Sequence, residues 1–160
     1  DGYRLPTEAE WEKAARGGRQ GRLFPLGDTI SHDQANFYSY WENGHPAYGY
    51  DLSQTEGYHP AYTNGGHPYK SPVGSFPANA YGLYDMAGNV WEWCWDWDSD
   101  YSPSNQVDPH GPPTYQSQYV RVMRGGSWDG AGGPRCSLRS AYYPGGVWGG
   151  QIGFRCVRSR

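Results

Sequence analysis

Cysteines are few in this sequence and long apolar runs are missing, and each shortage excludes a class of protein. Three cysteines in 160 residues are too few, and odd in number, for a disulfide framework, so they do not define a redox compartment. No apolar run approaches the ~18 residues of a transmembrane helix, so we expect no membrane span. Lysine and arginine form no run and the formal net charge is -3, which argues against a nucleic-acid partner.

Aromatic residues, glycine and proline are abundant instead. The chain has 8 Trp and 15 Tyr, which bury a large area while keeping one polar atom that needs a partner. Its 24 Gly and 13 Pro are too many for a mostly helical protein, because both residues interrupt regular structure. The aromatic residues are spread along the whole chain, which is not typical of disorder. We therefore expect a single domain over residues 1–160, made of short strands and long, tightly held loops.

One helix is strongly indicated, at about residues 8–16. Thr7 and Glu10 form a capping box, in which each side chain accepts a hydrogen bond from the backbone of the other residue. Gly17 supplies the left-handed residue that commonly ends a helix. The residues expected to face the core are Trp11, Ala14 and Ala15.

The rest of the chain predicts short strands between loops. Strands are expected within 72–86, where turns follow, and at 90–97, 119–123 and 152–157, with Asn43-Gly44 and Asn64-Gly65 as turns. Asp96, Asp98 and Asp100 alternate as in an EF-hand, but Tyr101 and Val107 stand where that loop requires Gly and Glu. We expect these carboxylates to be solvated. The histidines, which show no zinc-type spacing and are also expected to be solvated, are His32, His45, His59, His67 and His110.

Three sequence blocks resemble the formylglycine-generating-enzyme (sulfatase-modifying-factor) domain family. They are RLPTEAEWE at 4–12, NAYGLYDMAGNVWEW at 79–93, and RGGSW at 124–128 accompanied by IGFRC at 152–156. The resemblance spans nearly the whole chain but only the C-terminal part of the family's domain, so we expect the N-terminal part of that domain to be missing here. It implies an irregular, loop-rich α+β fold related to C-type lectins, with little regular secondary structure.

The family's catalysts bind copper(I) through two cysteines shortly after the Gly-Gly-Ser block. Those places fall near Gly130 and Arg135 in this chain, and soft thiolates are what copper(I) selects. We therefore expect no copper and no catalytic residue. By the same resemblance, Trp91 and Ser127 lie near the family's active site and would line a pocket.

The resemblance also leaves the cysteine pairing open. Cys136 matches a cysteine that forms a structural disulfide in the family, but Ala15 stands at its partner's place. The partner of Cys156 would lie before Asp1. Cys136 is either free or paired with Cys94, which would require Cα atoms within about 7 Å. The alternative for each cysteine is a small buried apolar residue.

Calcium is the cofactor that the resemblance implies. Calcium takes six to eight oxygen ligands, and mixed carboxylate and carbonyl sets suit it. The ligands of the first implied site are the side chains of Asp85 and Glu92 and the carbonyls of Gly88 and Val90. Alternatively, Glu92 is hydrogen-bonded to loop amides without a metal. A second implied site would use Asn36 and the Phe37 carbonyl, with Asn64 in place of a missing aspartate.

The segment 128–151 combines aromatic residues with small residues, which is typical of binding surfaces. Its expected ligand-binding residues are Trp128, Asp129, Arg135, Tyr142, Tyr143, Trp148 and Gln151. Within it, residues 129–150 also resemble the variable region of proteins diversified by retroelements, which use the same lectin-like fold. The alternative is a glycine-rich loop that only fills space.

These observations together favour a non-catalytic, calcium-stabilised binding or structural module, a pseudoenzyme of its family. Its partner would be a protein, a peptide or a glycan. Alternatively, it would be a neighbouring copy of the chain in an assembly, in which upstream residues of one copy complete the next. The alternative is a formylglycine-generating-type oxidase, or another oxygen-dependent enzyme that needs a partner domain. We expect a bacterial protein that is secreted, periplasmic or at the cell surface, although the sequence names neither the ligand nor the compartment.

Overall fold

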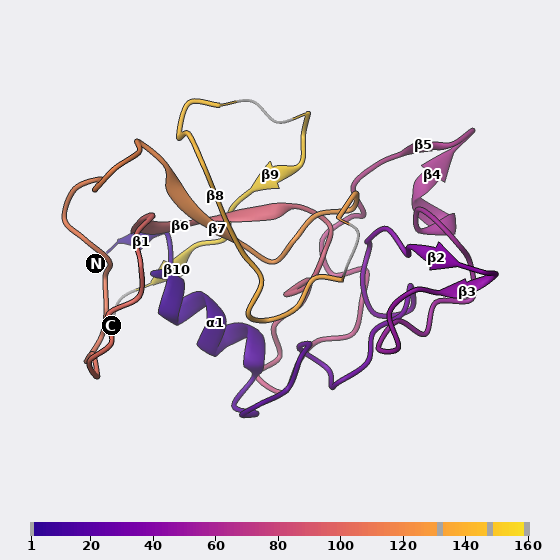
Figure 1. Cartoon of the computed structure of the whole chain (residues 1–160), viewed down its shortest axis with the longest axis horizontal. Helices are drawn as coiled ribbons and strands as arrows, with labels where there is room; N and C mark the ends of the chain where they lie inside the picture. The colour runs from indigo at the N-terminus through magenta and orange to yellow at the C-terminus, as the bar shows by residue number, and fades with distance from the viewer. Residues whose placement is uncertain (1, 131–132, 147–148, 159–160) are drawn as a thin grey trace.

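One four-stranded sheet and one helix form the centre of the molecule (Figure 1). The computed structural model describes residues 2–130, 133–146 and 149–158. The strand order is β8-β7-β6-β9, where β6 is Trp91–Trp97, β7 is Arg121–Arg124, β8 is Arg139–Tyr142 and β9 is Ile152–Gly153. The β6–β7 and β7–β8 pairs are antiparallel, and β6–β9 is parallel. The expected loop-rich α+β fold is confirmed.

Helix α1 spans Glu8–Arg16, as the capping signals predict. The capping box of Thr7 and Glu10 is present, and Gly17 ends the helix with a φ of 55°. Trp11 and Ala15 are buried against the sheet, with Ala14 partly buried beside them. Their cluster also contains Met86, Cys94, Val122 and Cys136. Within the described residues, no helix is long and apolar enough to cross a membrane.

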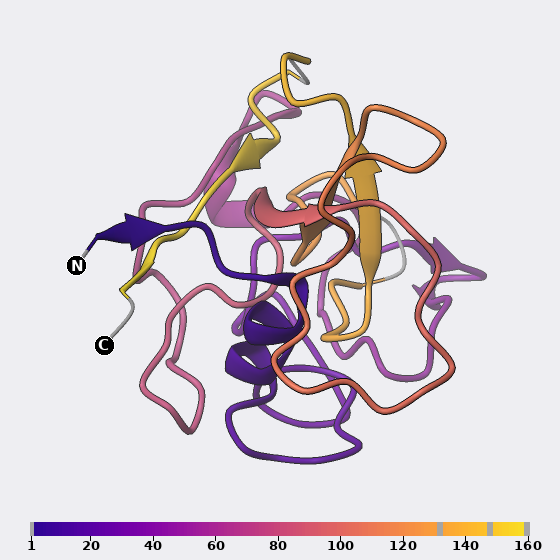
Figure 2. The same ribbon diagram turned by 90° about the vertical axis from the view of Figure 1, so that its left-hand side faces the viewer.

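Among the described residues, three two-stranded ladders surround this centre. Strands β1 (Tyr3–Arg4) and β10 (Val157–Arg158) pair, so the first and the last strand lie side by side (Figure 2). Strands β2 (Trp41–Glu42) and β3 (His45–Pro46) are joined by Asn43-Gly44, with φ of 52° and 81°, as expected for a tight hairpin. Strands β4 (Thr63–Asn64) and β5 (His67–Pro68) follow a short 3₁₀ helix, η1 (Pro60–Tyr62). Their turn is Gly65-Gly66, one residue later than the Asn64-Gly65 turn that we expected.

A second apolar cluster holds the long segment 17–71 in place. It contains Phe24, Ile30, Ala35, Phe37 and Ala87. Two histidines lie beside it, with exposed fractions of 7% for His32 and 8% for His59, so the expectation that they are solvated is wrong. Both rings are hydrogen-bonded and lie 5.1 Å apart between centroids.

Four further expectations need correction. The segment 72–86 contains turns and no strand, and the expected strand at 152–157 is interrupted at 154–156 between β9 and β10. Strand β8 lies in a glycine-rich stretch for which no strand was expected, because its sequence, RSAY, lacks apolar alternation. Asp96 is buried rather than solvated, and it accepts a hydrogen bond from the Glu8 amide at the start of α1. Asp98 is paired with Arg139 at 2.6 Å.

Candidate binding site

Some of the residues that we expected to bind a ligand lie close together, at the point where β6 and β9 begin. The Asp129 carboxylate accepts one hydrogen bond from the Ser127 hydroxyl and another, at 2.6 Å, from the side-chain amide of Gln151. The backbone carbonyl of Gln151 in turn accepts from the Trp91 amide at 2.7 Å. The two expected pocket residues, Trp91 and Ser127, are therefore linked to the expected ligand residues through Asp129 and Gln151.

The sheet geometry explains why these residues converge. Strands β6 and β9 run in parallel with Trp91 opposite Ile152, so the residues just before each strand are neighbours. After β7 the chain turns through Gly125 and Gly126, with φ of 95° and 74°, a conformation that favours glycine. This turn brings Trp128 back to the segment just before β6, where its amide donates to the Asn89 carbonyl at 2.9 Å.

Tyrosines from the long segment 17–71 extend this surface. The Trp128 ring lies 6.0 Å from that of Tyr58, which packs edge-on against Tyr38 at 4.9 Å. Further along, the Arg135 guanidinium lies over Tyr50 at 5.7 Å, and burial raises the pKa of Tyr50. The sequence reasoning missed these tyrosines, because only the general richness in tyrosine pointed to them.

Tyr142 and Tyr143 lie at the other end of the sheet. Tyr142, on β8, is opposite Arg121, which pairs with Trp97 at the C-terminal end of β6. Its ring lies 6.0 Å from that of Tyr143, which is 53% exposed. Gln151, in contrast, lies beside the N-terminal end of β6. The expected surface is thus divided into two groups, and Trp148 lies outside the described residues.

The residues of the first implied calcium site show one feature that suits a cation. Asp85 has one carboxylate oxygen bound to the Gly74 amide, whereas its Oδ1 is buried without a hydrogen-bond partner. No group of three or more His, Cys, Asp and Glu in the described residues could hold a metal, so an ion here would depend on the Gly88 and Val90 carbonyls. The orphaned oxygen fits a site of mixed ligands.

Glu92 is not held by loop amides, as its alternative interpretation expected. Its Oε2 accepts from the Trp11 indole at 2.6 Å and from the Arg155 Nε at 2.5 Å, and its Oε1 accepts from Arg155 Nη2 at 2.7 Å. A carboxylate has about four acceptor positions, so one remains at Oε1. Arg155 already balances the charge of Glu92, which weakens the attraction of this group for a second cation.

At the second implied calcium site, the expected ligand groups of Asn36 and Phe37 already have hydrogen-bond partners. The Phe37 carbonyl lies 3.1 Å from the ring of buried His32. The Asn36 side-chain amide donates to the Tyr69 carbonyl, and the Asn36 backbone carbonyl accepts from the Asn89 amide at 2.7 Å. Asn64 lies exposed on β4. Asn36 also forms a β-bridge with Gly88, so the two implied sites share backbone contacts.

The three thiols are all free, and two of them are buried in the core. Cys94 and Cys136 are free and fully buried, and burial raises the pKa of both, that of Cys136 to about 11. Both therefore behave as small core residues. Cys156 is free and exposed. The two places where the family's catalytic cysteines would fall hold Gly130 and Arg135.

The fold is a loop-rich α+β domain, and the sequence of the chain matches a known family of proteins. Residues 2–160 match the FGE-sulfatase family, described as the Sulfatase-modifying factor enzyme 1-like domain. The chain is 40% identical over 162 residues to the formylglycine-generating enzyme of Streptomyces coelicolor, covering 98% of this chain and 46% of that protein. The chain therefore belongs to the sulfatase-modifying-factor family.

Two further relatives bear on the site. The structure of Treponema denticola variable protein 1 superposes with a TM-score of 0.70 and 34% identity, covering 97% of this chain and 47% of that one. The mouse protein named inactive C-alpha-formylglycine-generating enzyme 2 is 36% identical, covering 99% of this chain and 44% of that protein. The chain spans less than half the length of these curated relatives, 46% and 44% respectively.

Proposed function

We propose that this chain is a non-catalytic binding module whose ligand surface centres on Trp128, Asp129 and Gln151. The observation that carries the proposal is the fixed Asp129 carboxylate, held by Ser127 and Gln151 beside the half-buried Trp128 ring. A carboxylate held in this way loses little freedom when a ligand binds, which favours affinity. Its remaining acceptor positions suit the N–H and O–H donors of a protein, peptide or glycan.

The chemistry of the thiols supports a non-catalytic role. Copper(I) requires thiolates, and the thiols of Cys94 and Cys136 are buried with raised pKa values. The mouse relative carries the word inactive in its name, and the Treponema relative is named a variable protein. The second name supports the hypothesis that 129–150 is a display segment whose side chains differ between versions of the protein.

Calcium belongs to the proposal as a stabiliser of the loops. It would be held by the Asp85 and Glu92 carboxylates and the Gly88 and Val90 carbonyls. The buried, unpartnered Oδ1 of Asp85 supports this assignment. Calcium would supply charge compensation to the turn that precedes β6. Asn89 lies in the same turn and accepts a hydrogen bond from the Trp128 amide. An ordered turn would therefore hold the ligand surface in place.

The binding test starts with peptides selected from a random library on the purified chain. We expect Asp129→Ala and Trp128→Ala to weaken the selected peptides by about tenfold or more, the equivalent of about 1.4 kcal/mol. Tyr3→Ala, at a ring that is 75% exposed on β1, is the matched control and should change nothing. Peptide binding that is unaffected by both variants at the surface would contradict the assignment.

An oxidase remains the alternative, favoured by the identity of 40% to the Streptomyces coelicolor enzyme. The distinguishing measurement is titration of the reduced chain with copper(I), followed by mass spectrometry of a cysteine-containing peptide incubated with oxygen. A binding module takes up no stoichiometric copper(I) and leaves the peptide unchanged. Formation of an aldehyde on the peptide would overturn our proposal. Sedimentation of the chain alone tests whether the partner is a second copy.

A further inference from the structure

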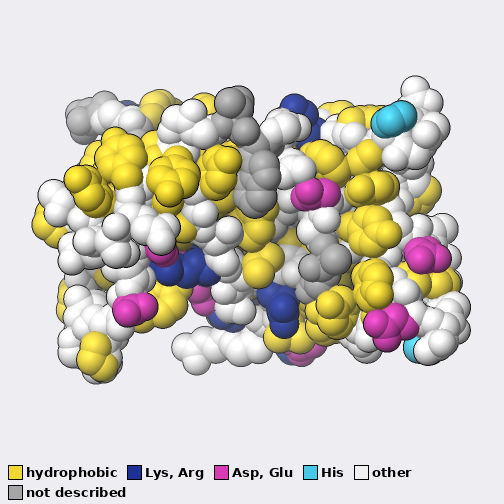
Figure 3. Space-filling view, turned by 45° about the horizontal axis from the view of Figure 1, so that its top comes forward, with side chains coloured by type: hydrophobic (Ala, Val, Ile, Leu, Met, Phe, Trp, Pro, Cys, Tyr) yellow, Lys and Arg dark blue, Asp and Glu magenta, His cyan; other side chains and the backbone are white. Residues whose placement is uncertain are grey.

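A large cleft lies along the outer side of α1, at the opposite end of β6 from the Trp128 surface. Its walls are α1 and the loop 98–117, and its volume is about 1330 Å³. Figure 3 shows the hollow at the left of the molecule, with acidic and basic side chains at its floor. Sites for small molecules usually enclose about 300–1,000 Å³, so this cleft has room for an extended ligand.

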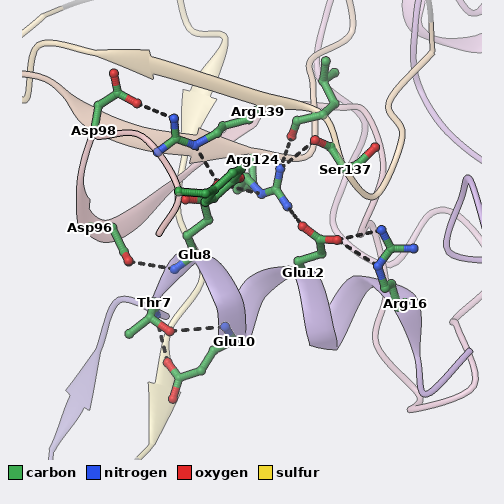
Figure 4. Close-up of polar contacts among 12 residues, drawn as sticks. Thr7, Glu8, Glu10, Glu12, Arg16, Asp96, Asp98, Arg124, Ser137 and Arg139 are labelled. Carbon is green, nitrogen blue, oxygen red and sulfur yellow. Dashed lines mark hydrogen bonds and ion pairs between the residues drawn. The ribbon is translucent and has the colours of Figure 1, made fainter. Parts of the chain in front are cut away.

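Ion pairs fill the floor of the cleft (Figure 4). Glu8 accepts hydrogen bonds from the Arg139 guanidinium and from the Tyr101 hydroxyl, each at 2.8 Å. Arg139 also pairs with Asp98 at 2.6 Å. These contacts connect α1, β8 and the loop after β6, so they hold the cleft open in one shape.

The charges of the cleft are nearly balanced. Five carboxylates and four lysine or arginine side chains line it. One turn after Glu8, the Glu12 carboxylate binds Arg16 at 2.6 Å and also the buried guanidinium of Arg124. Since Glu8, Glu12 and Asp98 are paired within the protein and the charges of the two signs nearly cancel, we expect the cleft not to attract a strongly charged ligand of either sign.

Aromatic rings and uncharged polar side chains make up the walls. Tyr81 is 53% exposed and Tyr101 is 67% exposed, and both line the cleft together with half-buried Trp97. The amides and hydroxyls on the walls are Gln20, Ser99, Ser102, Gln106, Gln116 and Ser117. Each such group donates and accepts hydrogen bonds.

We propose that this cleft binds a neutral oligosaccharide. A sugar ring has an apolar C–H face, which packs against aromatic rings such as those of Tyr81 and Tyr101 because the face of an aromatic ring carries partial negative charge. Its hydroxyls both donate and accept, and therefore suit amide and hydroxyl side chains and the outer oxygens of paired carboxylates. The volume of the cleft, about 1330 Å³, suits a chain of several sugar units better than a single sugar.

The test uses four neutral hexasaccharides, built from glucose in two linkages, N-acetylglucosamine and mannose. Each is titrated into ¹⁵N-labelled chain, and binding is followed through the indole N–H signals of the tryptophans. At least one hexasaccharide should bind and shift the Trp97 signal. Tyr81→Ala and Tyr101→Ala should each weaken that binding by about tenfold or more, because each removes a stacking ring.

Two more variants show whether binding depends on the tyrosine ring and on this cleft. Tyr101→Phe keeps the ring and removes only the hydroxyl that donates to Glu8, so binding should largely survive. Asp129→Ala alters the Trp128 surface and should leave sugar binding unchanged, whereas it should weaken the selected peptides. The two proposals can therefore fail independently.

Three outcomes would overturn the inference. The first is that none of the four hexasaccharides binds at millimolar concentration. The second is that binding survives both alanine variants in the cleft or is lost in Asp129→Ala. The third is that only an acidic oligosaccharide, used as a comparison, binds and that salt abolishes its binding, which would show selection by charge.

Discussion

Glu92 shows how one residue can serve the fold whether or not an ion is near it. Its carboxylate joins α1 to the C-terminal segment, because it binds both Trp11 and Arg155. Sequence reasoning singled out Glu92 through resemblance, but it could not find Arg155, which lies 63 residues later in the chain. Local patterns carry no information on such distant pairs.

Removal of calcium should lower the melting temperature of the chain. The reason is that the buried Oδ1 of Asp85 would lose its compensating charge. We expect a chelator to lower the melting temperature, and Glu92→Ala to abolish the difference between melting curves with calcium and with chelator. Asp85→Asn tolerates the φ of 55° at this position and should reduce the difference without removing it. Identical melting curves in calcium and in chelator would refute the calcium assignment.

At the scale of elements, the segment 17–71 is organised by side chains rather than by regular structure. His59 accepts a hydrogen bond from the Ala61 amide through Nδ1, and its Nε2 lies 2.7 Å from the carbonyl of His32. This arrangement needs a neutral ring. Burial lowers the pKa of both His32 and His59, and their mutual repulsion adds to the effect on His32.

Stability should therefore fall as the solution becomes acidic. Unfolded histidines take up protons below about pH 6.5, whereas these folded ones resist protonation, so unfolding is favoured as the pH falls from about 6.5. Urea denaturation measured between about pH 7.5 and about pH 5.5 should show a free energy of unfolding that falls as the pH falls. His59→Gln should reduce the slope of this dependence on pH. His45→Gln, at an exposed ring on β3, is the control and should keep the full slope. A slope unchanged in His59→Gln would mean that other groups cause the effect.

At the scale of the whole molecule, Gly88 joins the two cores. It forms a β-bridge with Asn36 from the long segment, and its amide donates to the Gly125 carbonyl beside the sheet. A Cβ at Gly88 would lie 2.3 Å from the Asn36 carbonyl oxygen, which cannot move freely because it belongs to the backbone. The two clusters should therefore unfold together.

Gly88→Ala should destabilise the whole chain, and Gly21→Ala is its matched control. Both glycines have similar φ, 71° and 73°, but a Cβ at Gly21 meets nothing within 4 Å. The left-handed conformation alone costs roughly 1–2 kcal/mol. We expect Gly88→Ala to lower the free energy of unfolding by at least about 2 kcal/mol more than this. Amide hydrogen exchange should become faster in both clusters. Faster exchange in only one cluster would show that they unfold separately.

The sequence predicts the parts of this molecule that depend on neighbours in the chain. Helix α1 is predicted because its cap residues lie beside it, and β6 because its stretch of the sequence is rich in aromatic residues. Strand β8 and the tyrosines around Trp128 could not be predicted, because tertiary contacts define them. The link between Ser127, Asp129 and Gln151 likewise depends on the parallel pairing of β6 and β9.

The pairing of β1 with β10 has a consequence for how such a unit is used. The two described ends lie in paired, adjacent strands, so a short linker can join them. Proteins with neighbouring ends tolerate insertion into a host chain and rejoining of their ends in a new order. A version whose ends are joined by a short linker and opened at the exposed tip of the β4–β5 hairpin should therefore still fold.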